Sequence, residues 1–303
     1  MTDSEHVVRA GQAADATYDV VVTPASAGWG RSGLRVVTLA AGGHVNLETG
    51  DAETVIVPLA GSATVVVDGE RFELTGRGSV FEGPTDVLYA PRDAEVALST
   101  AAGGRFALCS AVCERRLDPA YVPRSDVPVE LRGAGQASRQ VHNFGVPGVL
   151  EAERLIACEV LTPGGNWSSY PPHKHDEQRE GETRLEEIYY FEVADGPAGP
   201  GLGYQRVYGH AGADIDVCAE VRSGDVVLVP HGWHGPSMAA PGYDLYYLNV
   251  MAGPGPERAW LIIHDPDHAW VRDTWLTQQV DPRLPFSRPT DPDGTQQREG
   301  ASR

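Results

Sequence analysis

The residues best suited to chemistry in this sequence are a pair of histidines with metal-binding spacing. His173 and His175 form a His-x-His pair within the string YPPHKHD. In an extended segment, side chains two residues apart point to the same face, so both imidazoles can hold one ion while Lys174 turns to the opposite face. Imidazole and carboxylate groups are good ligands for divalent transition metals such as Zn, Mn, Fe and Ni. The pair therefore predicts half of a metal site.

The other half of the site is predicted from two neighbouring strand patterns. Glu187 opens the β-forming run 188–191, and His234 follows the strand-like run 224–230 and a Pro/Gly turn. Eleven residues separate His175 from Glu187, and they contain competing carboxylates at Glu180, Glu182 and Glu186. Glu187 is preferred because it alone adjoins the strand. We predict one ion per chain, held by His173, His175, Glu187 and His234.

The remaining histidines lack this joint spacing. His231 lies in the turn before His234 and is either a cation at the pocket mouth or a turn residue. The others are interpreted as structural, and they include His44, His264 and His268.

Composition limits the classes of partner. The chain has 42 acidic and 24 basic residues and a formal charge of −18, which disfavours nucleic acid and anionic membrane surfaces. An anionic small substrate then needs a local positive spot, which a metal can supply. No apolar run approaches the roughly 20 residues of a membrane span, and the string MTDSEHVVRAGQ lacks the order of a signal peptide. We therefore expect a cytoplasmic protein with a small-molecule partner, and the sequence leaves a homo-oligomer open.

Short β-forming runs alternate with turn residues along most of the chain. They include 34–39, 54–59, 63–67, 71–74, 87–90, 95–99 and 244–250. The turn Asp68-Gly69 predicts a tight hairpin, because both residues adopt positive φ readily. We predict an all-β fold of two antiparallel barrels or sandwiches, with a short helical segment at 265–279 that serves packing.

The predicted organisation has two domains and a tail. The N-terminal domain covers residues 1–130, the C-terminal metal-binding domain covers 131–280, and 281–303 is polar and Pro/Gly-rich, as disordered tails are. The Pro-containing stretch 118–138 is expected to be a crossover without strands.

The spacing of these motifs resembles the paired motifs of the cupin superfamily, so the fold is expected to be a bicupin. The sequence departs from the cupin pattern in two ways. Trp167 stands where the pattern has glycine, and eleven residues rather than three or four separate His175 from Glu187. In the first half, His44 and Asn46 stand where His-x-His is expected, Glu53 occupies the glutamate position, and no histidine follows the second motif. We expect that half to be a degenerate cupin without a metal.

A closer resemblance lies in four long strings. YPPHKHD, LEEIYYF, PGYDLYYLNVMAGP and WLIIHDPDHAWV are similar to the family of bacterial 5-deoxy-glucuronate isomerases of myo-inositol catabolism, which is related to the 5-keto-4-deoxyuronate isomerases. The similarity extends from GSVFEGPTDVLYAP to Trp270. It implies a metal-dependent aldose–ketose isomerase that converts 5-deoxy-D-glucuronate to 5-dehydro-2-deoxy-D-gluconate.

Such a reaction needs a base that carries a proton between C2 and C1. The candidates in the sequence are Glu180, Glu182, Glu186, Tyr189 and His231. For the carboxylate of the substrate the candidates are Lys174 and His231, and either Tyr246 or Tyr247 should face the pocket. Two other classes use the same ligand set, namely oxygen-dependent cupin dioxygenases or decarboxylases and non-catalytic sugar-binding cupins.

Overall fold

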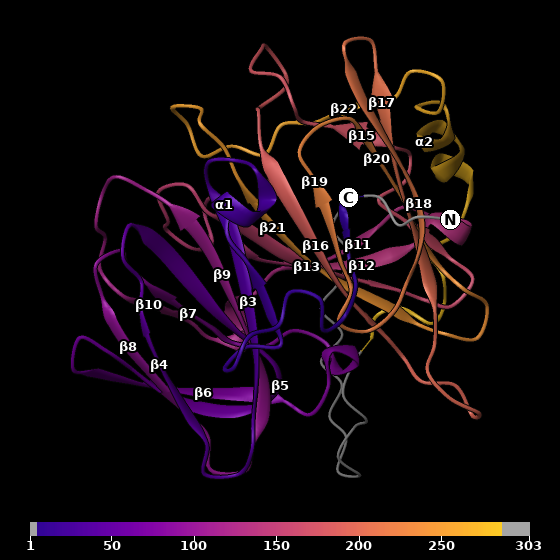
Figure 1. The fold of residues 1–303 in the computed structure, drawn as a ribbon. Helices are drawn as coiled ribbons and strands as arrows, with labels where there is room; N and C mark the ends of the chain where they lie inside the picture. Colours follow the sequence, from indigo (N-terminus) through magenta and orange to yellow (C-terminus); the bar gives the residue numbers. More distant parts are fainter. Residues whose placement is uncertain (1–4, 287–303) are drawn as a thin grey trace.

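Three antiparallel β-sheets form the framework of the computed structural model, which describes residues 5–286. Figure 1 shows two β-rich halves side by side, the first in indigo and purple and the second in magenta to yellow. The predicted all-β bicupin class is confirmed. Within residues 5–286, none of the helices has the length and apolarity that a membrane span requires.

The first half is a single nine-stranded sheet that folds back on itself. Its strands are β2 (Val20–Val22), β3 (Ser32–Leu39), β4 (His44–Glu48), β5 (Ala52–Val67), β6 (Glu70–Arg77), β7 (Val87–Ala90), β8 (Glu95–Ser99), β9 (Gly104–Val112) and β10 (Ala120–Val122). The first part of β5 pairs with β7 and β9, and its second part pairs with β6 and β8. A cluster of buried aliphatic side chains fills the interior between these two layers.

Strand β5 corrects one prediction and confirms another. The runs 54–59 and 63–67 were predicted as two strands, but they form one strand whose register shifts near Gly61. Gly61 has a φ of +89°, and a Cβ atom there would lie 2.5 Å from the carbonyl oxygen of Gly103. Such bulges bend a strand, which lets β5 serve both layers. The predicted hairpin turn is confirmed, since Asp68 and Gly69 have φ values of 49° and 87°.

The second half is a sandwich of two sheets around a second buried apolar cluster. The seven-stranded sheet contains β1 (Val7–Val8), β11 (Val129–Arg132), β12 (Arg139–Gly145), β13 (Ile156–Thr162), β16 (Glu186–Val193), β19 (Val226–Val229) and β21 (Leu245–Ala252). The six-stranded sheet contains β14 (Trp167–Ser168), β15 (His173–Lys174), β17 (Gly203–His210), β18 (Ala213–Val221), β20 (Trp233–Ala239) and β22 (Ile263–His264). The site lies between these two sheets.

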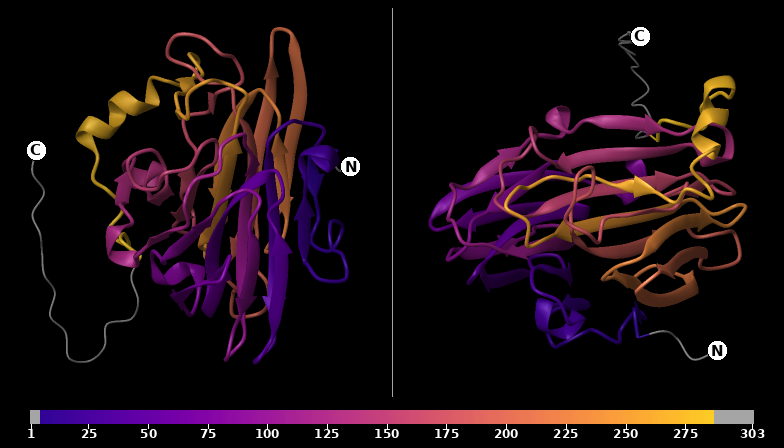
Figure 2. Two further views of the ribbon diagram at one scale, coloured as in Figure 1. Left: turned by 90° about the vertical axis from the view of Figure 1, so that its left-hand side faces the viewer. Right: turned by 90° about the horizontal axis from the view of Figure 1, so that it is seen from above.

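The helical segments are short and peripheral. They are α1 (Pro24–Ala27), α2 (Val271–Thr274), and the 3-10 turns η1 (Val80–Glu82), η2 (Arg124–Asp126), η3 (Gly135–Ala137) and η4 (Trp275–Thr277). The helix predicted over 265–279 is thus only α2 and η4, on the outside of the second half (Figure 2). The stretch 118–138, predicted without strands, contains β10 and β11.

The two halves share a buried core, and the first residues of the described chain join the second half. One apolar cluster contains side chains from both, such as Val55 and Tyr89 of the first half and Ile188 and Leu248 of the second. The N-terminal strand β1 pairs with β19 of the second half. At the other end, the backbone N–H of Phe286 donates to Gln140 Oε1 at 2.7 Å. The rest of the predicted tail, 287–303, lies outside the described residues.

Candidate metal centre and its cavity

The structure brings together the three histidines that the sequence singled out. Strand β15 pairs with β20 so that His173 is directly opposite His234. His175 follows β15, and its ring centroid lies 4.6 Å from that of His234. One ring nitrogen of each of the three side chains lies within 4.8 Å of the others, and all three residues are buried.

Glu187 approaches this group from the facing sheet. Its Oε2 atom lies 3.1 Å from His175 Nε2 and 3.2 Å from His234 Nε2, and the residue is 1% exposed. Burial acts to raise the pKa of this carboxyl, but the close contacts with His175 and His234 outweigh it and lower the pKa to about 2. The glutamate is therefore an ionised carboxylate inside the protein.

The hydrogen bonds of the imidazoles fit a cation at this point. The Nδ1 atoms of His175 and His234 lie 3.3 Å and 3.0 Å from the carbonyl oxygens of Leu185 and Gly232, where only an N–H group forms a favourable contact. In the neutral form that metal binding requires, each Nε2 atom would then offer its lone pair beside the carboxylate of Glu187. Within residues 5–286, His234 Nε2 has no hydrogen-bond partner. Lone pairs that converge in this way suit a divalent transition metal, with the backbone carbonyls fixing the tautomers.

His173 is also in a state that can ligate. Burial lowers its pKa well below the usual value, and the neighbouring rings of His234 and His175 add to the effect. Its imidazole is therefore neutral, as metal binding requires.

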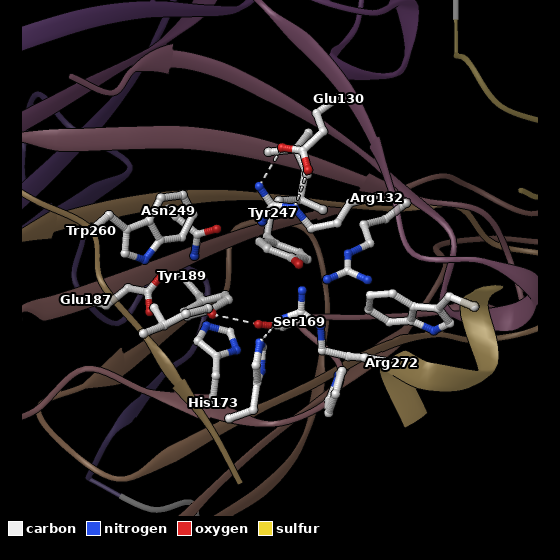
Figure 3. Close-up of a pocket in the computed structure, with 17 residues that line it drawn as sticks. Glu130, Arg132, Ser169, His173, Glu187, Tyr189, Tyr247, Asn249, Trp260 and Arg272 are labelled. Atoms are coloured by element: carbon white, nitrogen blue, oxygen red, sulfur yellow. Dashed lines mark hydrogen bonds and ion pairs between the residues drawn. The ribbon is translucent and has the colours of Figure 1, made fainter. Parts of the chain in front are cut away.

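A cavity of about 280 Å³ adjoins this group, near the lower limit of the roughly 300–1,000 Å³ that is usual for ligand pockets. His173 and Glu187 form part of its lining. In Figure 3, Glu187 lies on the left of the cavity and Arg132 and Arg272 on the right. The lining also includes the polar and aromatic side chains of Arg139, Ser169, Tyr189, Tyr247, Asn249, Trp260, His264 and Trp275. The cavity is suited in size to a small polar molecule such as a sugar acid.

Strand β21 settles which tyrosine faces the cavity. Tyr247 lines it, whereas the hydroxyl of Tyr246 donates to Glu159 Oε2 at 2.8 Å in the core shared by the halves. Successive side chains of a strand alternate between faces, so only one of the two can reach the site.

Tyr189 lies in the cavity wall beside the histidines. Its hydroxyl is 3.0 Å from Ser169 Oγ, and its ring centroid is 6.2 Å from that of His234. Burial, followed by the charge of Glu187, raises the pKa of Tyr189 well above the usual value. The phenol is therefore protonated and can donate a hydrogen bond into the cavity.

The carboxylates of the insertion do not line the cavity. Glu182 accepts hydrogen bonds from Lys174 Nζ at 2.8 Å and from Arg179 Nε at 2.7 Å. Glu186 points to the first half, where it accepts from the backbone N–H groups of Gly30 and Arg31, both at 2.8 Å. Glu180 is exposed. Glu182 therefore binds Lys174 and Arg179, Glu186 binds the backbone of the first half, and neither reaches the cavity.

Lys174 and His231 also lie outside the cavity lining. Lys174 turns away from the neighbouring histidines, as strand alternation predicted, and its ammonium forms ion pairs with three carboxylates, Asp176 at 2.5 Å, Glu177 at 2.9 Å and Glu182 at 2.8 Å. His231 Nε2 lies 3.2 Å from the carbonyl oxygen of Asp214. The structure thus places neither candidate where it would meet a carboxylate bound in the cavity.

The corresponding positions of the first half have a different role. His44 and Asn46 are exposed on β4. Glu53 is buried, and it accepts a hydrogen bond from the hydroxyl of Tyr89 at 2.8 Å and from the backbone N–H of Arg154 at 2.6 Å. Its carboxylate joins the two halves instead of binding beside a histidine.

Sequence reasoning missed a set of residues that meet only in the folded chain. His264, interpreted as structural, pairs with His173 across β15 and β22, and the two ring centroids are 6.2 Å apart. The segment expected only to pack contributes Arg272 and Trp275 to the cavity, which corrects that prediction. The remaining members are Arg132, Arg139, Asn249 and Trp260. Asn249 and Trp260 lie in two of the strings that resemble the family, PGYDLYYLNVMAGP and WLIIHDPDHAWV. The arginines had no such signal, because they come from separate strands and a terminal turn.

Comparisons with known proteins agree on one family. The model of the KduI/IolB family matches residues 6–271. The 5-deoxy-glucuronate isomerase of Geobacillus kaustophilus (strain HTA426) is 44% identical over 262 residues, which are 85% of this chain and 91% of the relative. The protein of the same name from Bacillus subtilis (strain 168) is 40% identical over 241 residues, 78% of this chain and 86% of the relative.

Solved structures show the same fold. An IolB-like protein from Salmonella typhimurium LT2 has a TM-score of 0.80 and 36% sequence identity, and the match covers 88% of this chain and 98% of that one. An oxalate decarboxylase from Lactobacillus farciminis has a TM-score of 0.62 at 12% identity, with 87% and 89% covered. At that identity the second likeness concerns the fold alone.

Proposed function

Because the chain belongs to the KduI/IolB family, we propose that it is a metal-dependent aldose–ketose isomerase of inositol catabolism. The reaction converts 5-deoxy-D-glucuronate to 5-dehydro-2-deoxy-D-gluconate. The observation that carries the proposal is the buried group of three histidines and a glutamate beside a cavity of sugar-acid size, in a chain that is 44% identical to a 5-deoxy-glucuronate isomerase. Its proposed partner is a small sugar acid, and its proposed compartment is the cytoplasm.

We assign one divalent transition metal, Zn, Mn, Fe or Ni, to His173, His175, Glu187 and His234. The support is the grouping of ring nitrogens of the three histidines within 4.8 Å of one another, together with the contacts of Glu187 Oε2 with His175 and His234. A bound metal would supply Lewis-acid chemistry for the isomerisation. We place the chemistry in the C-terminal unit, 131–280, since His44 and Asn46 of the first half are exposed and Glu53 is bound by Tyr89 and by backbone N–H groups.

We assign to Tyr189 the role of donating a hydrogen bond to the oxygens of the substrate. Isomerisation removes the C2 proton, returns a proton to C1, and transfers the hydroxyl proton from O2 to O1, so a donor beside the oxygens stabilises the charge that develops there. The phenol of Tyr189 is protonated and is fixed by Ser169. The remaining sequence candidates for proton transfer, Glu180, Glu182, Glu186 and His231, do not line the cavity.

An anaerobic assay tests this function against its closest rival. The metal-loaded protein should convert 5-deoxy-D-glucuronate without oxygen, and chelation should abolish the conversion. Turnover that depends on oxygen would instead support a dioxygenase or decarboxylase. Binding of the hexuronate without conversion under any metal would support a non-catalytic sugar-binding protein.

A further inference from the structure

One wall of the cavity concentrates positive charge in an otherwise acidic chain. Arg132 and Arg139 are directly opposite each other on the antiparallel strands β11 and β12, and Arg272 comes from α2. All three line the same cavity as His173 and Glu187. Like charges at directly opposite positions destabilise a sheet. This arrangement in a protein with a formal charge of −18 indicates a local function for the positive charge.

Arg139 is the buried member of this wall that lacks a counter-ion, whereas Arg272 is exposed and contacts the Nε2 atom of His264. Arg139 is 7% exposed, and within residues 5–286 its guanidinium makes one hydrogen bond, from Nη1 to the carbonyl oxygen of Ala137 at 3.0 Å, and no ion pair. Arg132, by contrast, donates to both carboxylate oxygens of Glu130 at 2.9 Å and 2.6 Å. Burial lowers the pKa of Arg139 to about 10, and the charges of Arg132 and Arg272 contribute. Burial of a guanidinium without an anion costs free energy. A bound anion at this wall would offset that cost.

Indole rings hold these guanidinium groups in place. Arg139 and Arg272 lie over the ring of Trp275, at 5.5 Å and 5.7 Å from its centroid, and Arg132 lies 5.9 Å from the centroid of Trp260. Stacking of this kind uses the face of a guanidinium and leaves the N–H groups at its edge available. The wall is therefore positive and lies against two indole rings.

The neighbouring polar groups of the cavity are also donors without acceptors. Asn249 is 3% exposed, and within residues 5–286 its Nδ2 atom has no hydrogen-bond partner. The buried Nε1 atoms of Trp260 and Trp275 likewise have none in that range. Buried donors are normally satisfied, so this excess indicates a ligand rich in acceptor oxygens.

We propose that Arg139, with Arg272 at the cavity mouth, binds the carboxylate of the sugar-acid substrate and so selects hexuronates over neutral sugars. This inference rests on the proposed function and adds the residues that determine specificity. Arginine is suited to the task because its paired N–H groups match the two oxygens of a carboxylate. With C1 and C2 directed to the histidines and the carboxylate to Arg139, the substrate is fixed at both ends, which orients the reacting carbons.

Paired substrates test the assignment. For Arg139→Gln we expect the KM for 5-deoxy-D-glucuronate to rise roughly 10- to 100-fold, as for loss of a hydrogen bond to a charged group. The kcat/KM for 5-deoxy-D-glucose, in which a hydroxymethyl group replaces the carboxylate, should not fall. Arg139→Lys should recover part of the preference for the acid. Arg206→Gln is the matched control, because Arg206 pairs with Asp216 on β17 and β18 outside the cavity, and it should behave as wild type.

Three further measurements make each outcome decisive. Thermal unfolding and metal content show whether Arg139→Gln is folded and loaded with metal. Arg272→Gln, at an exposed position, provides a second variant if it is not.

An unchanged ratio of kcat/KM for the acid to kcat/KM for the neutral sugar in the folded, metal-loaded variants overturns the inference and leaves the isomerase assignment intact. If the wild type does not isomerise the acid, the proposed function fails, and calorimetric titration with D-glucuronate and D-glucose then tests the arginine site by itself. Equal affinity of the wild type for both sugars would refute it.

Discussion

Arg77 and Glu159 form a buried, doubly hydrogen-bonded ion pair across the boundary between the two halves. Arg77 Nη1 donates to Glu159 Oε1 at 2.7 Å, and Nη2 donates to Oε2 at 2.6 Å, with both side chains almost fully buried. His142 Nδ1 lies 2.6 Å from Oε1, and the hydroxyl of Tyr246 donates to Oε2 at 2.8 Å. Because Tyr246 and Tyr247 are adjacent on β21, this network holds the strand whose other face lines the cavity.

Removal of one partner of this pair should destabilise the whole protein. For Arg77→Met we expect the free energy of unfolding to fall by about 3–5 kcal/mol, because the carboxylate of Glu159 stays buried without its counter-ion. Urea unfolding followed by tryptophan fluorescence measures the loss. Arg71→Met is the control on the same strand, since Arg71 is exposed and should change the stability by less than about 0.5 kcal/mol. A similar small change for Arg77→Met would contradict the role of the pair.

The same carboxylate predicts a loss of stability in acid. Burial acts to raise the pKa of Glu159, but the charge of Arg77 and the hydrogen bond from His142 lower it to about 2, against an ordinary value of 4.5. A group whose folded pKa is depressed stabilises the protein fully above the unfolded pKa and loses that contribution as pH falls through the folded pKa. We expect up to about 3 kcal/mol to disappear between pH 4.5 and 2. Unfolding experiments across this window should show a shallower pH dependence for Glu159→Gln, and equal slopes would refute the assignment.

Metal analysis tests the ligand set. His234→Ala should lower metal content and isomerase activity together, because an incomplete shell binds the ion more weakly. His44→Ala, at an exposed position of the first half, should retain one equivalent of metal per chain and full activity. Full occupancy in His234→Ala would mean that the fourth ligand is a different residue. Two equivalents in the wild type, with one lost in His44→Ala, would refute a single site.

Tyr189→Phe separates the chemistry from metal binding. Without the hydroxyl, kcat should fall roughly 100-fold or more while the metal content stays at the wild-type level. Tyr190→Phe is the neighbouring control, since its hydroxyl donates to Glu192 on the opposite face of β16, away from the cavity. If Tyr189→Phe turned over at the wild-type rate, the proton donor would have to be another residue of the cavity.

Lys174 is predicted to stabilise the insertion and not to bind substrate. Lys174→Met should lower the melting temperature, since Asp176, Glu177 and Glu182 would repel one another without the ammonium. The ratio of activity on 5-deoxy-D-glucuronate to that on 5-deoxy-D-glucose should be unchanged. A selective loss of activity on the acid would return Lys174 to the list of substrate ligands.

The sequence determined those features that depend on short-range periodicity. Alternation of side chains along a strand places His173 and His175 together and turns Lys174 away, and this holds whatever the rest of the chain does. The positive φ values of Asp68 and Gly69 fix the hairpin in the same local way. The β class and the family resemblance follow from many such local patterns, so they were visible without a structure.

The tertiary structure decided everything that depends on which strands become neighbours. The register of β21 places Tyr247 in the cavity and Tyr246 in the shared core, and no pattern within one strand specifies which face is which. Glu182 and Glu186 were candidates for the catalytic base, yet in the folded chain they accept hydrogen bonds from groups outside the cavity. Arg139 and Arg272 lie far apart in the sequence and meet only because β12 and α2 close the same cavity. Long-range packing sets such contacts, so the arginine wall became visible only in the folded chain.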